Sequence, residues 1–121
     1  MRYIFIILTL MLATPAMADK YVCHTIKKTA CQALGCKAME VLPDDFRIIN
    51  EEQRTYEIET DKISLSSSET SGAFKIFKFG ATSFIKISTI DAKAVELKRG
   101  QFLEVRDIGL LTISSWGACK F

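Results

Sequence analysis

Three of the four cysteines and the only histidine lie within fourteen residues near the start of the chain, in the stretch CHTIKKTACQALGC. These residues are Cys23, His24, Cys31 and Cys36, and the fourth cysteine is Cys119, close to the other end. Thiolates and a neutral imidazole can bind zinc, paired thiols can carry out redox chemistry, and oxidised thiols form disulfides. Each of these chemistries requires its own spacing and its own cellular compartment.

The first eighteen residues, 1–18, predict export. A basic start containing Arg2 precedes an apolar run from Ile4 to Ala13, and Ala16-Met17-Ala18 supplies small residues at the positions that a signal peptidase recognises. This is the layout of a secretory signal peptide. The run is shorter than the roughly 20 apolar residues that span a membrane. We therefore expect a single mature domain over residues 19–121, a periplasmic or secreted location, and no membrane span.

Export favours disulfides as the role of the cysteines. In an oxidising compartment, an even number of cysteines in a short chain is typical of a disulfide framework, and four cysteines allow three pairings. Cys31 and Cys36 enclose Gln-Ala-Leu-Gly, whose glycine permits a tight turn, so we prefer the pairs Cys31–Cys36 and Cys23–Cys119. In the chain-entropy model the long bridge, closing about 97 residues, is worth about 4–5 kcal/mol and the short one about 2 kcal/mol.

Zinc binding and redox catalysis are the alternatives for the same cysteines. Zinc sites usually separate paired cysteines by about two to four residues, and only Cys31 and Cys36 fit this spacing. Cys23 and His24 are adjacent, so on a strand their side chains point to opposite faces. A thioredoxin-like motif needs two residues between its cysteines, whereas four separate Cys31 from Cys36. We expect no metal and no cofactor, with His24 an ordinary strand residue.

The elements that position these residues are predicted to be strands almost throughout. Short alternating runs bounded by turn residues recur about every ten residues. The expected strands are 21–26, 46–50, 55–60, 62–66, 73–79, 83–89, 94–97, 101–106 and 110–114. Short connections between them favour an all-β fold, a small antiparallel meander barrel or sandwich of about eight short strands, stapled by disulfides.

Three segments depart from simple alternation. In the run 73–79, Phe74 and Phe77 fall on opposite faces, which indicates a bulge or a strand covered on both sides. The polar segment 64–72, SLSSSETSG, is expected to end a strand and enter a loop. The best of the weak helix candidates is the segment 29–39, which Cys31, Gly35 and Cys36 interrupt.

Charge and composition argue against several functions. Removing residues 1–18 takes away only Arg2 from the 16 basic residues, which leaves 15 against 14 acidic ones and gives no argument for nucleic-acid binding. With one histidine and no GxSxG motif, the chain lacks a nucleophile paired with a base, so we expect it not to be an enzyme. Trp116 is expected to fill the core beside a disulfide. Four acidic residues alternate with apolar ones and are expected to face solvent, namely Glu57, Glu59, Glu96 and Glu104.

The two ends of the chain and one internal motif resemble a known family. Tyr21-Val22-Cys23, Ala118-Cys119-Lys120 and Ser71-Gly72-Ala73-Phe74 are similar to segments of the periplasmic C-type lysozyme inhibitor family. In that family the serine enters the target's active-site cleft, and a second motif places a lysine after an aromatic residue, as Thr-Lys-Gly. The matching place here is Phe77-Lys78-Phe79-Gly80, with the lysine displaced by one residue, which on a strand reverses its face. The resemblance implies Ser71 and Lys78 as binding residues and a lysozyme as the protein partner.

The insert with Cys31 and Cys36 is not part of that family pattern, and the cysteine-rich start also resembles small exported bacterial proteins with no assigned role. Two hypotheses of function therefore lead. The first is a small exported β-barrel binding module, with periplasmic lysozyme inhibition as its most specific form. The alternative is a structural or envelope-associated protein without a discrete active site.

Overall fold

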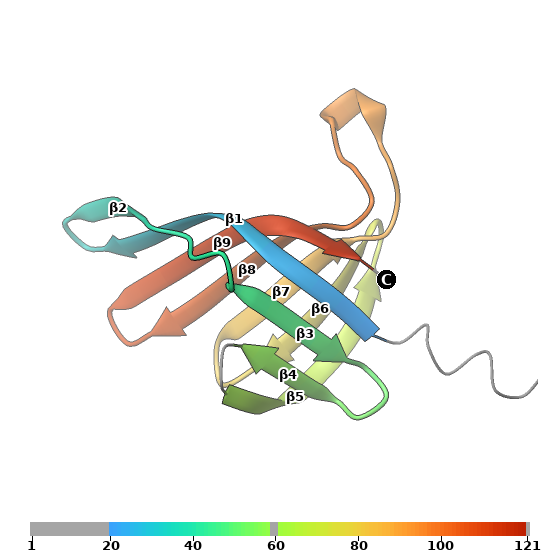
Figure 1. Ribbon diagram of the computed structural model, residues 1–121, viewed down its shortest axis with the longest axis horizontal. Coiled ribbons are helices and arrows are strands. Elements are labelled where there is room, and N and C mark those ends of the chain that lie inside the picture. The colour runs from blue at the N-terminus through green and yellow to red at the C-terminus, as the bar shows by residue number, and fades with distance from the viewer. Residues whose placement is uncertain (1–19, 59–60, 121) are drawn as a thin grey trace, which may run out of the picture.

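Nine antiparallel strands make up most of the described chain, residues 20–58 and 61–120 of a computed structural model (Figure 1). Apolar and polar residues alternate along most strands, so one face of each strand packs inward while the other meets solvent. The strands are β1 Lys20–Gln32, β2 Gly35–Met39, β3 Phe46–Asn50, β4 Thr55–Ile58, β5 Asp61–Ser71, β6 Phe74–Phe79, β7 Ser83–Ser88, β8 Gln101–Ile108 and β9 Leu111–Lys120. The predicted signal peptide, 1–18, lies outside the described residues.

Eight of these strands close into an antiparallel barrel, because the last strand, β9, pairs with the first, β1. The order around the barrel is β1-β3-β4-β5-β6-β7-β8-β9, so from β3 onward each strand pairs with the next along the chain. Closure removes the free sheet edges that these strands would otherwise expose. The all-β prediction is thus confirmed, and the structure selects the barrel over the sandwich.

The ninth strand, β2, lies outside the barrel and forms a hairpin with the second half of β1. This hairpin projects from one side of the barrel, next to the β8–β9 turn (Figure 1). Gly35 turns the chain with a φ of 132°, a conformation that residues with a Cβ rarely adopt. The weak helix candidate over 29–39 is therefore wrong, because the turn and the facing cysteines, Cys31 and Cys36, require two extended strands.

Aromatic and branched aliphatic side chains fill the barrel interior. They are Tyr21, Cys23, Ile49, Tyr56, Ile58, Leu65, Phe77, Phe79, Ile85, Ile87, Phe102 and Cys119. Rings pack closely, with centroids 4.4 Å apart for Tyr56 and Phe79 and 5.6 Å for Tyr21 and Phe77. A filled interior of this kind makes the barrel a packed core and not a channel.

The change of phase in β6 comes from burial on both sides of the strand. Phe77 and Phe79 face the interior, whereas Phe74 and Ile76 face outward and are half-buried. The pairing of β6 with β7 is regular, and the register shift on its other side falls on β5.

Two segments differ from their predicted conformations. The polar segment SLSSSETSG stays in the sheet up to Ser71, because β6 provides a ladder partner along that length. The run 94–97 is not a strand but belongs to a loop that contains a 3₁₀ turn, Lys93–Val95, and a single bridge between Ala92 and Leu97. Glu96 has a φ of 54° in the left-handed region, which interrupts an extended conformation.

Candidate functional site

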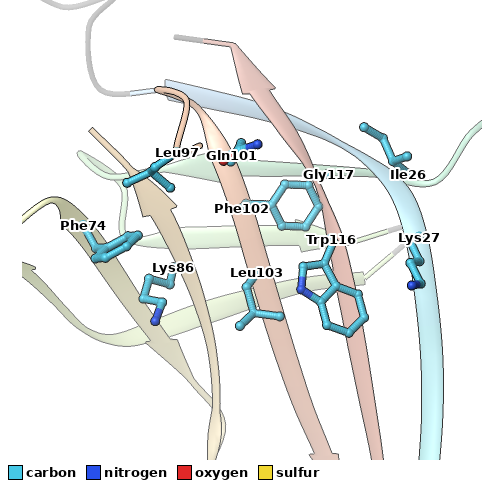
Figure 2. A pocket seen from close by; sticks show the side chains of 10 residues that line it. All are labelled: Ile26, Lys27, Phe74, Lys86, Leu97, Gln101, Phe102, Leu103, Trp116 and Gly117. Atoms are coloured by element: carbon cyan, nitrogen blue, oxygen red, sulfur yellow. The ribbon is translucent and has the colours of Figure 1, made fainter. Parts of the chain in front are cut away.

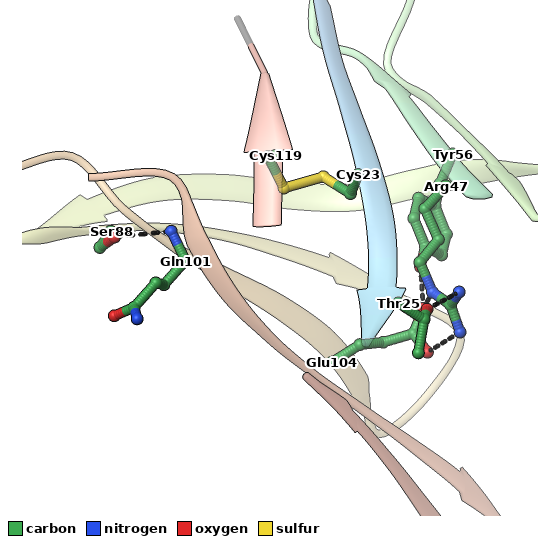
Figure 3. The surroundings of a disulfide bond; sticks show 8 residues. All are labelled: Cys23, Thr25, Arg47, Tyr56, Ser88, Gln101, Glu104 and Cys119. Carbon is green, nitrogen blue, oxygen red and sulfur yellow. Dashed lines mark hydrogen bonds and ion pairs between the residues drawn. A yellow bond between two sulfur atoms is a disulfide. The ribbon is translucent and has the colours of Figure 1, made fainter. Parts of the chain in front are cut away.

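The two disulfides lie in different environments. Cys23–Cys119 joins the first and last strands of the barrel, and both residues are buried (Figure 3). Cys31–Cys36 bridges the projecting β1–β2 hairpin, where Cys36 is exposed. These are the pairs favoured by the cysteine spacing, and two disulfides fit an oxidising compartment. Within residues 20–58 and 61–120, no group of three or more His, Cys, Asp or Glu side chains could hold a metal ion, and His24 is an exposed strand residue.

Fully buried opposite charges meet inside the barrel. Arg47 of β3 and Glu104 of β8 form a bidentate pair, with Nε donating to Oε2 at 2.9 Å and Nη2 to Oε1 at 3.0 Å (Figure 3). The hydroxyl of Tyr56 donates to the same carboxylate, and Arg47 Nη2 also donates to the hydroxyl of Ser115 at 3.3 Å. The carboxylate therefore faces a cation and a hydroxyl donor, which is what a buried charge requires.

Asp45, immediately before β3, extends this charged cluster. It accepts hydrogen bonds from Arg47 and, at 3.2 Å, from Thr25, and it forms an ion pair with Lys28 at 2.8 Å. Burial raises the pKa of Asp45, but hydrogen bonds and charges from Lys28 and Arg47 outweigh this and hold the pKa below its ordinary value. Burial acts to lower the pKa of Arg47, but Glu104 and Asp45 reverse that effect and raise it.

The prediction that Glu104 faces solvent is wrong. On β8 the inward face carries Phe102 and Glu104, while the apolar Leu103 faces outward and is half-buried. Alternation alone identifies two faces but does not say which one is inside. The sequence did contain a signal for a buried ion pair. Arg47 shares a strand face with Ile49, and Glu104 shares one with Phe102, so an acid and a base both lie on faces that carry a large apolar side chain. Of the other acidic residues expected at the surface, Glu96 is exposed and Glu57 half-buried, and Glu59 lies outside the described residues.

Ser71 and Lys78 are both exposed, but they are not brought together. Ser71 ends β5 and pairs with Phe74 across a tight turn in which Gly72 has a φ of 58°. Lys78 lies four residues beyond Phe74 on β6, which corresponds to about 13 Å along the strand. Its ammonium is 3.7 Å from the carboxylate of Glu69.

A different lysine, Lys86 of β7, approaches the turn that carries Ser71. Its Nζ lies 4.8 Å from the centre of the Phe74 ring. The turn is also fixed by Thr89, whose backbone N and Oγ1 both donate to the carbonyl of Ala73, at 2.8 and 3.0 Å. The sequence reasoning missed both residues, because their contacts with Phe74 and Ala73 depend on the pairing register of β6 with β7.

An apolar groove of about 360 Å³ crosses the outer face of the barrel (Figure 2). The residues that line it are Ile26, Lys27, Phe74, Lys86, Leu97, Gln101, Phe102, Leu103, Trp116 and Gly117. Trp116 is 40% exposed here, so the expectation that it fills the core is wrong. On β9 the residues Ser115 and Cys119 face inward, and alternation therefore turns Trp116 outward.

Comparison with known proteins identifies no relative. No protein-family model matches the chain. Neither a curated protein nor a solved structure matches it. Among the described residues, no helix has the length and apolar character needed to cross a membrane. Function must therefore be inferred from the surface of the barrel itself.

Proposed function

We propose that this protein is a binding module of an oxidising, extracytoplasmic compartment and that it recognises its partner through its outer surface. The filled interior supports an outer site, since packed side chains and the Arg47 cluster occupy the space in which a ligand-carrying barrel would hold its ligand. In this proposal the protein is not an enzyme, because Arg47 engages both buried carboxylates, Asp45 and Glu104, inside the barrel.

The most specific form of this proposal is inhibition of a C-type lysozyme by the turn that follows Ser71. One observation carries it: Ser71 is exposed at a tight hairpin turn that Thr89 fixes through two hydrogen bonds to Ala73. A turn held in one conformation loses little entropy when it enters a cleft. A serine hydroxyl can donate to a catalytic carboxylate, and a nearby ammonium can neutralise its charge.

The geometry favours Lys86 over Lys78 as that ammonium. Lys86 contacts Phe74, which pairs with Ser71, whereas Lys78 lies further along β6 beside Glu69. The sequence resemblance implies Lys78 in this role. Both lysines therefore belong in the test.

The test is an assay of cell-wall lysis by a C-type lysozyme in the presence of residues 19–121. We expect inhibition at micromolar protein. Ser71→Ala should weaken binding by about 2–5 kcal/mol, because removal of the serine hydroxyl leaves a buried carboxylate of the lysozyme without its hydrogen-bond donor. Lys86→Ala should weaken binding more than Lys78→Ala. Lys37→Ala, on the projecting hairpin, is the matched control.

Two results would contradict this proposal at different levels. Absence of inhibition at micromolar protein would exclude a C-type lysozyme as the partner. Inhibition that Ser71→Ala leaves unchanged would keep the lysozyme as the partner and move the binding site away from the turn.

A further inference from the structure

Four side chains form one row across the outer face of the barrel. The strand pairings place Lys27 opposite Trp116, Trp116 opposite Leu103, and Leu103 opposite Lys86, on β1, β9, β8 and β7 in turn. Residues directly opposite in antiparallel strands project from the same face. Figure 2 shows the row, with the two apolar side chains in the middle and a lysine at each end.

The apolar part of this row has a shaped floor. A Cβ on Gly117 would collide with the carbonyl oxygen of His24 and lie 2.6 Å from the Phe102 ring, so only glycine lets these groups pack this closely. At the β1 end, the register shift between Thr25 and Lys27 leaves Ile26 outside the ladder, and its side chain is 72% exposed. Exposed apolar surface arranged in this way is typical of an interaction site.

The charges of the groove are of one sign. Of the ten lining residues, the two that carry charge are Lys27 and Lys86. Their ammonium groups lie 5.9 Å from the Trp116 ring centre and 4.8 Å from that of Phe74, respectively. Across residues 20–58 and 61–120, neither has a carboxylate within ion-pairing distance, whereas Lys28 and Lys75 do. The complementary ligand is therefore apolar in the middle and anionic at both ends.

The distance between the two lysines selects the kind of ligand. Three strand spacings of about 4.8 Å separate Lys27 from Lys86, which is about 14 Å in all. In an extended peptide, residues i and i+4 are about 13 Å apart on one side of the chain, with residue i+2 between them. We propose that this groove binds an extended peptide segment of the pattern acidic–x–apolar–x–acidic. A headgroup with a single anionic centre reaches one lysine but not both.

This peptide site goes beyond the proposed lysozyme inhibition and does not depend on it. Lys86 and Phe74 adjoin both sites, whereas Lys27 and Trp116 lie on β1 and β9, away from Ser71 on β5. Variants at Lys27 therefore leave the Ser71 turn unchanged.

Trp116, the single tryptophan of the chain, provides a direct readout. The probe is a blocked peptide containing Glu-Ser-Leu-Ser-Glu, titrated against residues 19–121 while tryptophan emission is recorded. We expect a saturable blue shift that weakens as salt is added, because exposed charges are screened. Lys27→Glu should reduce the affinity about ten-fold, since an attraction becomes a repulsion. Lys37→Glu makes the same change of charge on the projecting hairpin and should leave the affinity within about two-fold.

Control ligands test the spacing and the chemistry. A peptide of the same composition with adjacent acids, Glu-Glu-Ser-Leu-Ser, and a basic peptide, Lys-Ser-Leu-Ser-Lys, should bind at least about ten-fold more weakly. Equal affinity for either control, or no emission change at millimolar peptide, overturns the proposal. Binding of phosphatidylglycerol vesicles that requires Lys27, without binding of the acidic peptide, would assign the groove to anionic lipid and overturn it as well.

Discussion

The barrel interior and the outer groove both combine apolar side chains with positive charges, but these positive charges have different partners. Inside, Arg47 has the carboxylates of Asp45 and Glu104 and the hydroxyls of Thr25 and Ser115 within hydrogen-bonding distance. Outside, the lysines of the groove lie over aromatic rings that cannot neutralise them. A buried charge needs an oppositely charged partner within the chain, whereas an exposed charge is solvated and can form an ion pair with another molecule. The interior charges therefore stabilise the barrel, whereas the charges of the groove are the ones that the proposed peptide site uses.

The disulfides follow the same division between inside and outside. Cys23–Cys119 is buried and joins residues 96 apart, so it ties the two strands that close the barrel. Cys31–Cys36 joins residues five apart in a hairpin that projects from the barrel. The stability of the barrel should depend far more on the first than on the second.

The largest expected effect is the loss of the buried disulfide. Replacing Cys23 and Cys119 together by alanine should lower the free energy of unfolding by about 4–5 kcal/mol, because the unfolded chain regains the freedom of a long loop. Urea denaturation followed by circular dichroism measures the change. The matched control replaces Cys31 and Cys36 by alanine and should cost about 2 kcal/mol. Equal losses in the two variants would contradict the division between barrel and hairpin.

Removal of the buried cation should have the next largest effect. Arg47→Met should cost about 3–5 kcal/mol, because it removes the bidentate partner of the fully buried Glu104 carboxylate and one of the two cations that face Asp45. The same denaturation experiment measures it. Adding Glu104→Leu to this variant should recover part of the loss, since one unpaired charge is then removed. If adding Glu104→Leu to Arg47→Met lowers the free energy of unfolding as much as a core substitution does by itself, the two residues do not act as a pair.

The sequence was sufficient for the all-β class, but not for the choice of a barrel over a sandwich, which rests on the pairing of β1 with β9, nor for the buried charges or the groove. Alternation and turn residues located most of the strands, and the number and spacing of the cysteines, in a chain with a predicted signal peptide, led to the disulfide pairs. The inward position of Glu104 and the outward position of Trp116 were missed, because alternation defines two faces and does not by itself say which one is inside. The approach of Lys86 to the Ser71 turn was also hidden, since it depends on tertiary pairing between strands.

A smaller effect is expected at Asp45, and it should depend on pH. Asp45→Asn should cost about 1–3 kcal/mol at neutral pH, because it removes a charged acceptor from Lys28 and Arg47. The pKa of Asp45 is lower in the folded protein than the unfolded value of about 3.9. Its stabilising contribution is therefore complete above that value and is lost as the pH falls through the lowered folded pKa. The difference in stability between the wild type and Asp45→Asn should shrink in acid, and a constant difference from pH 7 to pH 2 would contradict this account.

The smallest effect is expected for the cations of the groove. Lys27→Gln and Lys86→Gln should each change the free energy of unfolding by less than about 0.5 kcal/mol, because surface charges without an ion-pair partner contribute little to folding. The same urea denaturation measures this, with Arg47→Met as the internal contrast. A decrease in the free energy of unfolding of more than about 1.5 kcal/mol in either variant would show that these lysines stabilise the barrel. It would then contradict the view that their charges serve to bind an acidic peptide. If the two variants keep their stability but bind the acidic peptide more weakly, Lys27 and Lys86 contribute to peptide binding and not to folding.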